Sequence, residues 1–361
     1  MESIQQTREI INMPSIMDKL KKNSKLDSEI ITKSKYYGKK EMASTDVPMM
    51  NVALSGSIDG GLSPGVTILA GPSKHFKTSF SLKIASAYMQ KYPDAVMLFY
   101  DSEFGSPQSY FDMFDIDMER VLHCPITNIE ELKFDLTNQL ENITKGDKVI
   151  IVVDSLGNLA SKKEVEDALN EKAVADMTRA KQLKSVFRIA TPHLSMKDIP
   201  FIGIAHTYDT QEMFSKKVVS GGTGLYYSAD DIWILGRRQN KEGTSIVGYD
   251  FVINVEKSRY VREKSIIPIS VTWEGGVDNY SGLLDVALAG KFVIKPSNGW
   301  YSKVDPETGE VEDKKYRAKE LTKDFWDGII NTTQFKEFTE NNFKQGGSSN
   351  IEVVSEDELE E

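Results

Sequence analysis

Cysteine is almost absent from this sequence of 361 residues, with Cys124 as its single copy. One cysteine can form neither an intramolecular disulfide nor a cysteine-rich zinc site, which favours a reducing compartment inside the cell. Long apolar runs are missing too, since none approaches the roughly 18 residues that a membrane helix needs. Residues 1–8 are polar and no apolar core follows them, so a secretory signal is not expected. These absences predict a cytoplasmic protein with no membrane partner.

Positive charge is also in short supply, because 44 Lys and Arg face 54 Asp and Glu, for a net charge of −10. As an average over the chain, this balance argues weakly against nucleic acid as a partner. The charge is uneven, however: eight lysines lie within residues 19–41, and six acids lie in the last ten residues. Residues 346–361, which begin Gly-Gly-Ser-Ser, predict a flexible acidic tail. Such a tail can still compete with DNA for basic surfaces.

Short apolar runs alternate with amphipathic stretches through the middle of the chain. The runs predict strands at residues 66–70, 96–100, 149–153, 201–205, 251–256 and 266–271. Helical periodicity predicts a helix over residues 78–91 and another over 162–187, continuous or broken once. Continuous apolar strands separated by helices indicate an α/β fold whose mostly parallel sheet is covered on both faces. Residues 301–315, charged and turn-rich, are typical of an exposed hairpin or loop.

The most informative motif follows the first expected strand and opens the first expected helix. It reads Gly71-Pro72-Ser73-Lys74-His75-Phe76-Lys77-Thr78-Ser79. This is the phosphate-binding loop pattern, in which backbone N–H groups at a helix N-terminus receive phosphate oxygens. Lys77 suits the β- and γ-phosphates of ATP, and Thr78 suits Mg²⁺. Phe76 replaces the usual second glycine and restricts the backbone there. The alternative is a Gly-Pro turn with an incidental Lys-Thr pair.

Two carboxylates follow expected strands. Asp154 comes directly after residues 149–153, and Glu103 lies just beyond residues 96–100. Ligands bind at the carboxyl ends of parallel strands, so both side chains are expected at the loop. Asp154 can hold Mg²⁺ through a bound water, and Glu103 suits a base that activates the attacking water. The alternatives are a strand-ending Asp that caps a turn and a solvated loop acid.

These residues together resemble the RecA-type recombinases, and most closely the branch of T-even-like phages. The likeness spans roughly residues 45–305 and rests on stretches at 71–79, 98–105, 153–160, 211–216, 221–224, 275–282 and 298–301. Order and spacing agree throughout. Phe76 is a feature of the phage branch, so it does not imply an inactive ATPase. The resemblance implies a RecA-like P-loop ATPase core.

The resemblance also implies roles for individual residues. Glu103 would be the catalytic glutamate, Lys77 and Thr78 the phosphate and Mg²⁺ contacts, and Asp154 the second Mg²⁺ group. Tyr110 matches an aromatic residue that stacks on adenine. His206 stands where the family commonly places glutamine as the γ-phosphate sensor; without the family, it is a strand-end histidine with satisfied hydrogen bonds.

Two further residues, Lys257 and Arg259, match basic side chains that the family directs across a subunit interface onto the neighbour's ATP. A cation supplied in this way stabilises charge on the leaving phosphoryl group, and it makes hydrolysis depend on filament assembly. On the local sequence alone, a solvated basic turn is the alternative.

Two regions match the family's DNA-binding loops, near residues 161–172 and 207–219. The expected DNA contacts are Arg179, Phe214, Lys216, Lys217, Gly221 and Gly222. Lysine and arginine would contact phosphates without reading sequence, and Phe214 could stack on bases. An ordinary exposed loop is the alternative for the second region.

The resemblance leads to four expected segments. Residues 1–45 would form a helix plus an extended stretch at 30–32 that packs on a neighbouring subunit. Residues 46–282 would form the ATPase core, 283–345 a small C-terminal subdomain, and 346–361 the tail.

The predicted function is ATP-dependent homologous recombination. Subunits would form a helical filament on single-stranded DNA, pair it with homologous duplex and exchange strands during recombination, repair and recombination-dependent replication. Expected partners are a single-strand DNA-binding protein, a recombination mediator and a helicase of the same phage, in the host cytoplasm. The alternatives are a hexameric helicase with the same core fold and a non-enzymatic binding module with a degenerate phosphate loop.

Overall fold

The computed structural model describes residues 15–170, 178–210, 217–242, 244–273 and 276–347. The chain divides into two units, residues 1–40 and 41–361. In the first unit, helix α1 (Ile16–Asn23) is capped by Ser15 and Asp18, which exchange side-chain and backbone hydrogen bonds. The extended stretch expected at residues 30–32 is wrong in part, because residues 31–33 form the 3₁₀ turn η1. The Lys33 N–H donates to the Ile30 carbonyl at 2.7 Å, so a local hydrogen bond takes the place of strand pairing.

The second unit is built on a nine-stranded sheet with the order β11-β10-β9-β8-β1-β5-β4-β2-β3. Its strands are β1 (Gly65–Ala70), β2 (Val96–Asp101), β3 (Val121–Pro125), β4 (Val149–Asp154), β5 (Pro200–Ala205), β8 (Asp231–Glu242), β9 (Ser245–Lys257), β10 (Ile266–Thr272) and β11 (Gly276–Val277). The run from β8 through β1 to β3 is parallel, whereas β8 to β11 pair antiparallel. The mostly parallel sheet expected from the apolar runs is therefore confirmed.

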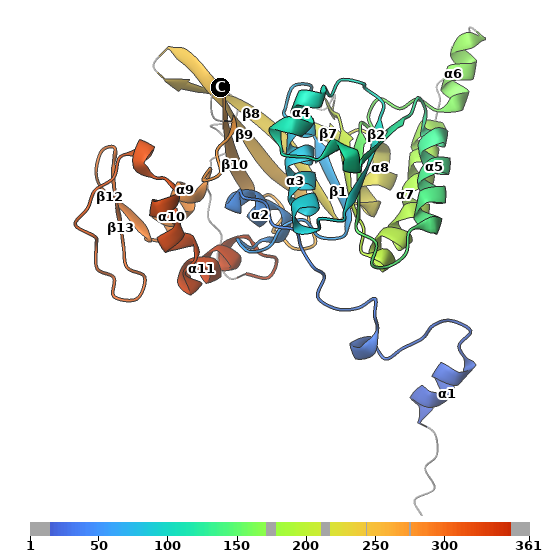
Figure 1. The fold of residues 1–361 in the computed structure, drawn as a ribbon, viewed down its shortest axis with the longest axis horizontal. Helices are drawn as coiled ribbons and strands as arrows, with labels where there is room; N and C mark the ends of the chain where they lie inside the picture. Colours follow the sequence, from blue (N-terminus) through green and yellow to red (C-terminus); the bar gives the residue numbers. More distant parts are fainter. Residues whose placement is uncertain (1–14, 171–177, 211–216, 243, 274–275, 348–361) are drawn as a thin grey trace, which may run out of the picture. The chain divides into compact units, whose positions relative to one another are not determined.

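Helices and short hairpins complete the second unit (Figure 1). The helices are α2 (Pro48–Ser55), α3 (Lys77–Lys91), α4 (Gln108–Met113), α5 (Ile129–Asn142), α6 (Lys162–Leu169), α7 (Thr178–Lys197), α8 (Gly222–Ser228), α9 (Leu283–Ala289), α10 (Lys323–Ile330) and α11 (Thr333–Phe343), with 3₁₀ turns η2 (Met118–Arg120) and η3 (Ala318–Glu320). The hairpins pair β6 (Thr207–Asp209) with β7 (Lys217–Val219) and β12 (Val293–Ser297) with β13 (Trp300–Lys303). The helical pattern expected at 162–187 is divided between α6 and α7.

Apolar cores cover both faces of the sheet, and strand β1 shows why. All six of its residues are buried. Leu69 packs in the core that includes Phe80 of α3, while Ile68 packs in the core that includes Phe187 of α7. Alternate side chains of one strand thus enter different cores, so the strand sequence is continuously apolar. This arrangement fixes the carboxyl end of β1, where the phosphate loop begins.

The C-terminal elements share an apolar core with the rest of the second unit. Phe325 and Trp326 of α10 and Phe335 of α11 are buried in the same cluster as Ile267 of β10. The hairpin expected at residues 301–315 forms around β13, with isolated bridges from Tyr301 to Tyr316 and from Val304 to Val311. The expected tail falls mostly on residues 348–361, outside the described part of the chain. Within the described residues, no helix combines the length and apolar character needed to cross a membrane.

Candidate nucleotide site

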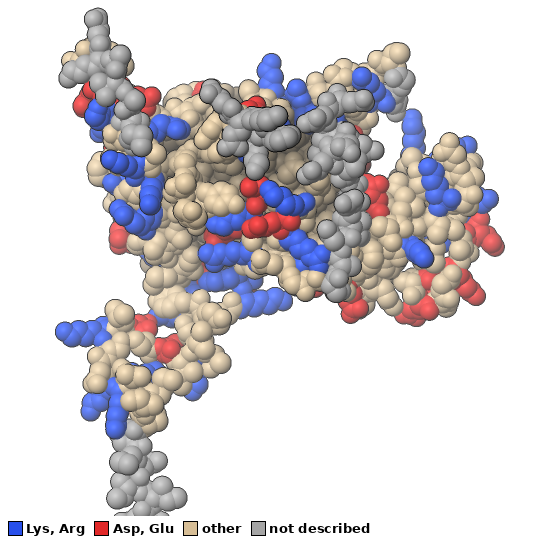
Figure 2. All heavy atoms as spheres, turned by 180° about the vertical axis from the view of Figure 1, so that it is seen from behind, with Lys and Arg blue, Asp and Glu red and all other residues tan. Residues whose placement is uncertain are grey.

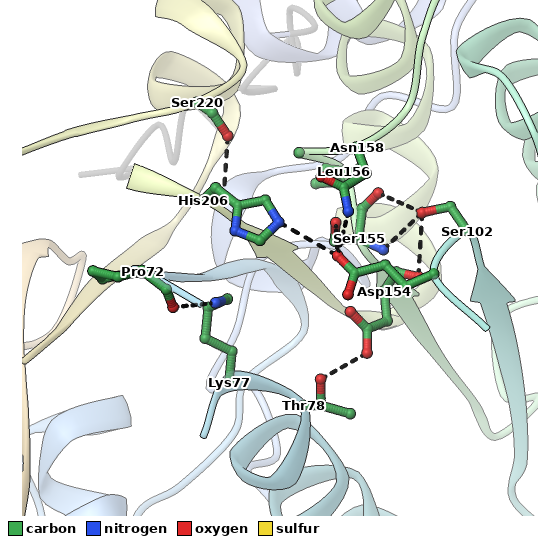
Figure 3. A network of polar contacts seen from close by, with 12 residues as sticks. Pro72, Lys77, Thr78, Ser102, Asp154, Ser155, Leu156, Asn158, His206 and Ser220 are labelled. Atoms are coloured by element: carbon green, nitrogen blue, oxygen red, sulfur yellow. Dashed lines mark hydrogen bonds and ion pairs between the residues drawn. The ribbon is translucent and has the colours of Figure 1, made fainter. Parts of the chain in front are cut away.

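A cavity of about 300 Å³ lies at the carboxyl ends of the parallel strands. It is lined by residues 73–79, Glu103, Tyr110, Asp154, Ile204 and His206. The phosphate loop leaves β1, Glu103 follows β2, Asp154 ends β4 and His206 follows β5. Parallel strands therefore bring side chains that are up to about 130 residues apart to one edge, as the strand-end rule predicts. Figure 3 shows the polar contacts at this edge of the sheet, with Lys77, Thr78, Asp154 and His206 among the labelled residues.

The phosphate loop connects β1 to the N-terminus of α3. Two of its non-glycine residues, Lys74 and Phe76, adopt left-handed backbone with φ of 62° and 60°. The Lys77 ammonium is buried and donates to the Pro72 carbonyl of the same loop at 2.7 Å. Burial lowers the pKa of Lys77, although Glu103 and Asp154 oppose that shift. A desolvated ammonium at a helix N-terminus is well placed to bind anionic oxygens.

Thr78 and Asp154 form the second part of the site. The Thr78 hydroxyl donates to Asp154 Oδ2 at 2.7 Å, and Asp154 is only 4% exposed. Burial raises the pKa of Asp154 to about 6, which the Thr78 hydrogen bond partly offsets. A divalent cation would compensate this buried carboxylate, and hydroxyl and carboxylate oxygens suit Mg²⁺. The two side chains therefore fit the expected ion, although no group of three or more His, Cys, Asp or Glu suited to a metal occurs among the described residues.

Glu103 is held in place by side chains from the segment after β4. Its Oε1 accepts hydrogen bonds from the Ser155 hydroxyl and from the Asn158 amide, both at 2.7 Å. Asp101 fixes the backbone of the same loop, because its Oδ1 accepts the N–H groups of Glu103 and Phe104 at 3.0 and 2.7 Å. Sequence reasoning gave no role to Ser155, Asn158 or Asp101. Their position at the end of β2, for Asp101, and just after the end of β4, for Ser155 and Asn158, was the signal that could have pointed to them.

His206 and Tyr110 complete the lining. His206 Nε2 lies 3.4 Å from Glu103 Oε1, and the His206 backbone N–H donates to the Ser220 hydroxyl at 3.2 Å. This second contact joins the strand end to the segment after β7. Tyr110 stands on α4 and is 36% exposed. An aromatic face at the rim of a phosphate cavity suits a stacked base.

Lys257 and Arg259 do not line this cavity. The Lys257 ammonium donates to the carbonyls of Tyr226 and Ala229 at 2.8 and 2.6 Å, at the C-terminus of α8. Arg259 Nε lies 2.5 Å from Asp230 Oδ1. Both cations are therefore held away from the phosphate loop of their own chain. Their action on a neighbour's nucleotide stays a prediction.

The predicted DNA contacts have different surroundings. Arg179 donates to the carbonyls of Leu159 and Gly157 at 2.8 and 2.7 Å, and so braces the segment after β4. Gly221 has a φ of 115°, which favours glycine, and an added Cβ would lie 2.8 Å from Leu183 Cδ2, so that side chain would have to shift. Gly222 follows with a φ of 75°, and Lys217 is exposed on β7. Phe214 and Lys216 lie outside the described residues.

The surface is not uniformly acidic, despite the net charge of −10. Figure 2 shows Lys and Arg side chains gathered on the face behind that of Figure 1, with Asp and Glu among them. Local basic surface is therefore available for a polyanion.

A parallel sheet with a phosphate loop after β1 and a strand-end Asp beside the loop threonine is the architecture of the P-loop fold class. Residues 280–339 match the family model described as Bacteriophage T4, Recombination and repair protein, C-terminal domain. The chain is 53% identical over 336 residues to the Recombination and repair protein of Enterobacteria phage T4, covering 92% of this chain and 86% of that protein. The chain belongs to the phage T4 branch of the RecA-type recombinases.

Bacterial relatives are more distant. Identity is 26% over 255 residues to Protein RecA of Chloroherpeton thalassium, covering 70% of this chain and 69% of that protein. Identity is 25% over 290 residues to Protein RecA of Tropheryma whipplei, covering 79% and 64%. The expected family and the RecA-like core are thereby confirmed, and these relatives give the helicase alternative no support.

Proposed function

We propose that this recombinase binds ATP with Mg²⁺ at the phosphate loop and hydrolyses it when assembled on DNA. The observation that carries the proposal is the Thr78–Asp154 hydrogen bond, together with Glu103 in the lining of the same cavity. Lys77 and the loop N–H groups would hold the phosphates, and Tyr110 would stack on adenine. Thr78 and Asp154 would hold Mg²⁺, which supplies neutralisation of charge on the phosphate oxygens.

Glu103 is the proposed base. Among the described residues, its hydrogen bonds all fall on Oε1, which leaves Oε2 to accept a proton from the attacking water. Ser155 and Asn158 prevent rotation of the carboxylate and thereby fix the direction of Oε2. His206 would donate a hydrogen bond to the γ-phosphate, and its backbone contact with Ser220 would transmit the nucleotide state toward the second DNA loop.

Lys257 and Arg259 would complete the site of a neighbouring copy, so that hydrolysis requires a helical filament. The filament would form on single-stranded DNA through backbone contacts from Lys217, Lys216 and Arg179, with stacking by Phe214. Base pairing with a homologous duplex would supply sequence specificity during strand exchange. Strand exchange by a phage recombinase would also involve a single-strand DNA-binding protein, a mediator and a helicase as partners, in the cytoplasm of the host cell.

The direct test is strand exchange between homologous single- and double-stranded DNA, with and without ATP. ATPase assays with and without single-stranded DNA accompany it, on the wild type and on Glu103→Gln. We expect Glu103→Gln to lose at least about 100-fold in turnover while it retains ATP binding. Glu119→Gln, an exposed change of the same chemistry, is the matched control. Absence of DNA-stimulated turnover in the wild type would sink the proposal, and closed rings instead of open filaments by electron microscopy would favour the helicase.

A further inference from the structure

Phe76 stands where the general phosphate-loop pattern has its second glycine. Its φ is 60° and its ψ is 19°, a left-handed conformation that side chains other than glycine rarely adopt. The loop has thus kept the backbone shape that glycine would permit, but with a bulky residue. Something outside the loop must stabilise that shape.

The Phe76 ring is anchored between two other phenylalanines. It stacks on Phe251 of β9 with 5.1 Å between ring centroids and 24° between planes. Its edge contact with Phe80 in α3 has a centroid distance of 5.3 Å. Phe80 and Phe251 are 0% and 2% exposed and also contact each other at 5.7 Å. The rings therefore attach the last residue of the phosphate loop to the buried core.

A second contact holds the loop two residues earlier, at the other left-handed position. Arg237 of β8 donates from Nη1 to the Lys74 carbonyl at 3.1 Å. The Arg237 guanidinium also lies over the Tyr249 ring at 4.6 Å. Arg237 and Phe251 are direct partners in the β8–β9 pairing. One cross-strand pair of the two-stranded β8–β9 ribbon therefore supplies both contacts that hold the loop. Phe251 contacts Phe76, and Arg237 contacts the Lys74 carbonyl.

We propose that Phe76 and Arg237 are positioning residues, through which the β8–β9 ribbon holds the phosphate loop in its nucleotide-binding shape before nucleotide arrives. The inference rests on the proposed nucleotide site. An untethered loop must be ordered when the ligand binds, and that loss of freedom weakens binding. Glycine at position 76 would permit the same backbone shape, but it would also permit many others. Restoring the general pattern should therefore weaken nucleotide binding.

The first test measures binding of the magnesium complex of ADP to the full chain by calorimetry, without DNA. We expect Phe76→Gly to bind about tenfold more weakly, with a less favourable binding entropy. Phe76→Tyr keeps the stacked ring and should stay within about twofold of the wild type. Phe187→Leu in α7 is the matched control, because it removes a fully buried ring from the other core of the sheet and leaves the Phe80 and Phe251 contacts of Phe76 intact. We expect it to lower the melting temperature and to leave the affinity within about twofold.

The second test uses adjacent arginines of β8. Arg237→Gln should weaken binding about threefold, because the Lys74 carbonyl loses its donor. Arg238→Gln breaks an ion pair with Asp250 of the neighbouring strand β9, at 3.3 Å, and should leave the affinity unchanged. The positioning role would be overturned if folded Phe76→Gly bound nucleotide as tightly as the wild type, or if the two arginine variants had equal effects. The proposed nucleotide site would stand in either case. Absence of binding by the wild type would instead overturn the proposed site.

Discussion

Arg259 Nε lies 2.5 Å from Oδ1 of Asp230, and the two side chains are 66% and 6% exposed. The other carboxylate oxygen of Asp230 accepts the Val66 N–H of β1 at 2.8 Å. A nearly buried anion attached to the sheet thus holds a cation at the surface. The Asp230 carboxylate therefore holds the Arg259 guanidinium beside the sheet by opposite charge.

Asp230→Asn keeps an oxygen for the Val66 N–H but removes the charge that holds Arg259. We expect DNA-stimulated ATPase to fall about tenfold, while ATP binding by the variant stays unchanged. Steady-state turnover at saturating single-stranded DNA and equilibrium nucleotide binding check this. Asp250→Asn is the matched control, because Asp250 pairs with Arg238 on the same ribbon. An equal loss in the control would reduce the Asp230–Arg259 pair to a stabiliser of the ribbon.

The role of Lys257 across an interface can be tested by mixing subunits. Lys257→Ala should lose ATPase activity and retain ATP binding, and Glu103→Gln should do the same. If one subunit supplies Glu103 and its neighbour supplies Lys257, a 1:1 mixture contains about a quarter of fully intact interfaces by random pairing. We expect the mixture to recover up to about a quarter of the wild-type ATPase activity on single-stranded DNA. A mixture as inactive as either variant alone would place both residues in the same subunit's site.

Asp231 should make stability depend on pH. It is buried and accepts a hydrogen bond from the Ser258 hydroxyl at 2.6 Å. Burial raises its pKa to about 7, the Ser258 hydrogen bond opposes the shift, and neighbouring Asp230 adds to it. Between about pH 4 and pH 7 the folded state holds a proton that the unfolded state has released. This term therefore stabilises the fold fully below about pH 4 and is lost as pH rises to about 7.

Asp231→Asn should remove that pH dependence. We expect the wild type to lose about 2–4 kcal/mol of unfolding free energy relative to the variant between pH 4 and pH 7.5. Urea unfolding of both proteins across this range measures the difference. Parallel curves for the two proteins would show that Asp231 titrates at its ordinary pKa.

The acidic end of the chain should modulate DNA binding. Six acids lie in the last ten residues, and deletion of residues 348–361 removes all of them. If the tail competes with DNA for basic surface, deletion should strengthen single-stranded DNA binding several-fold at low salt and little at high salt. A salt titration of DNA affinity on both proteins is the measurement. An unchanged salt dependence would leave the segment as a solubility feature.

Local pattern was sufficient for much of the fold. The expected strands at 66–70, 96–100, 149–153, 201–205 and 266–271 agree with the structure within one residue at each end. Strand β9 was expected over 251–256 but begins at Ser245, because its first half lies in the ribbon with β8 and is only partly buried. Strand β3 was missed, since this edge strand is mostly exposed and shows no apolar alternation.

By itself, the sequence determined the parallel sheet, the phosphate loop and the two strand-end carboxylates. Each depends on residues close together in the chain: apolar runs buried on two faces, a loop at a helix N-terminus, and an acid after a strand. Only the tertiary structure decided which groups hold these parts in place. These contacts join residues that are at least 29 positions apart in the sequence. Ser155 and Asn158 hold Glu103, Phe251 and Arg237 hold the phosphate loop, and Asp230 holds Arg259. Such contacts depend on strand order and register, which periodicity along one strand does not encode.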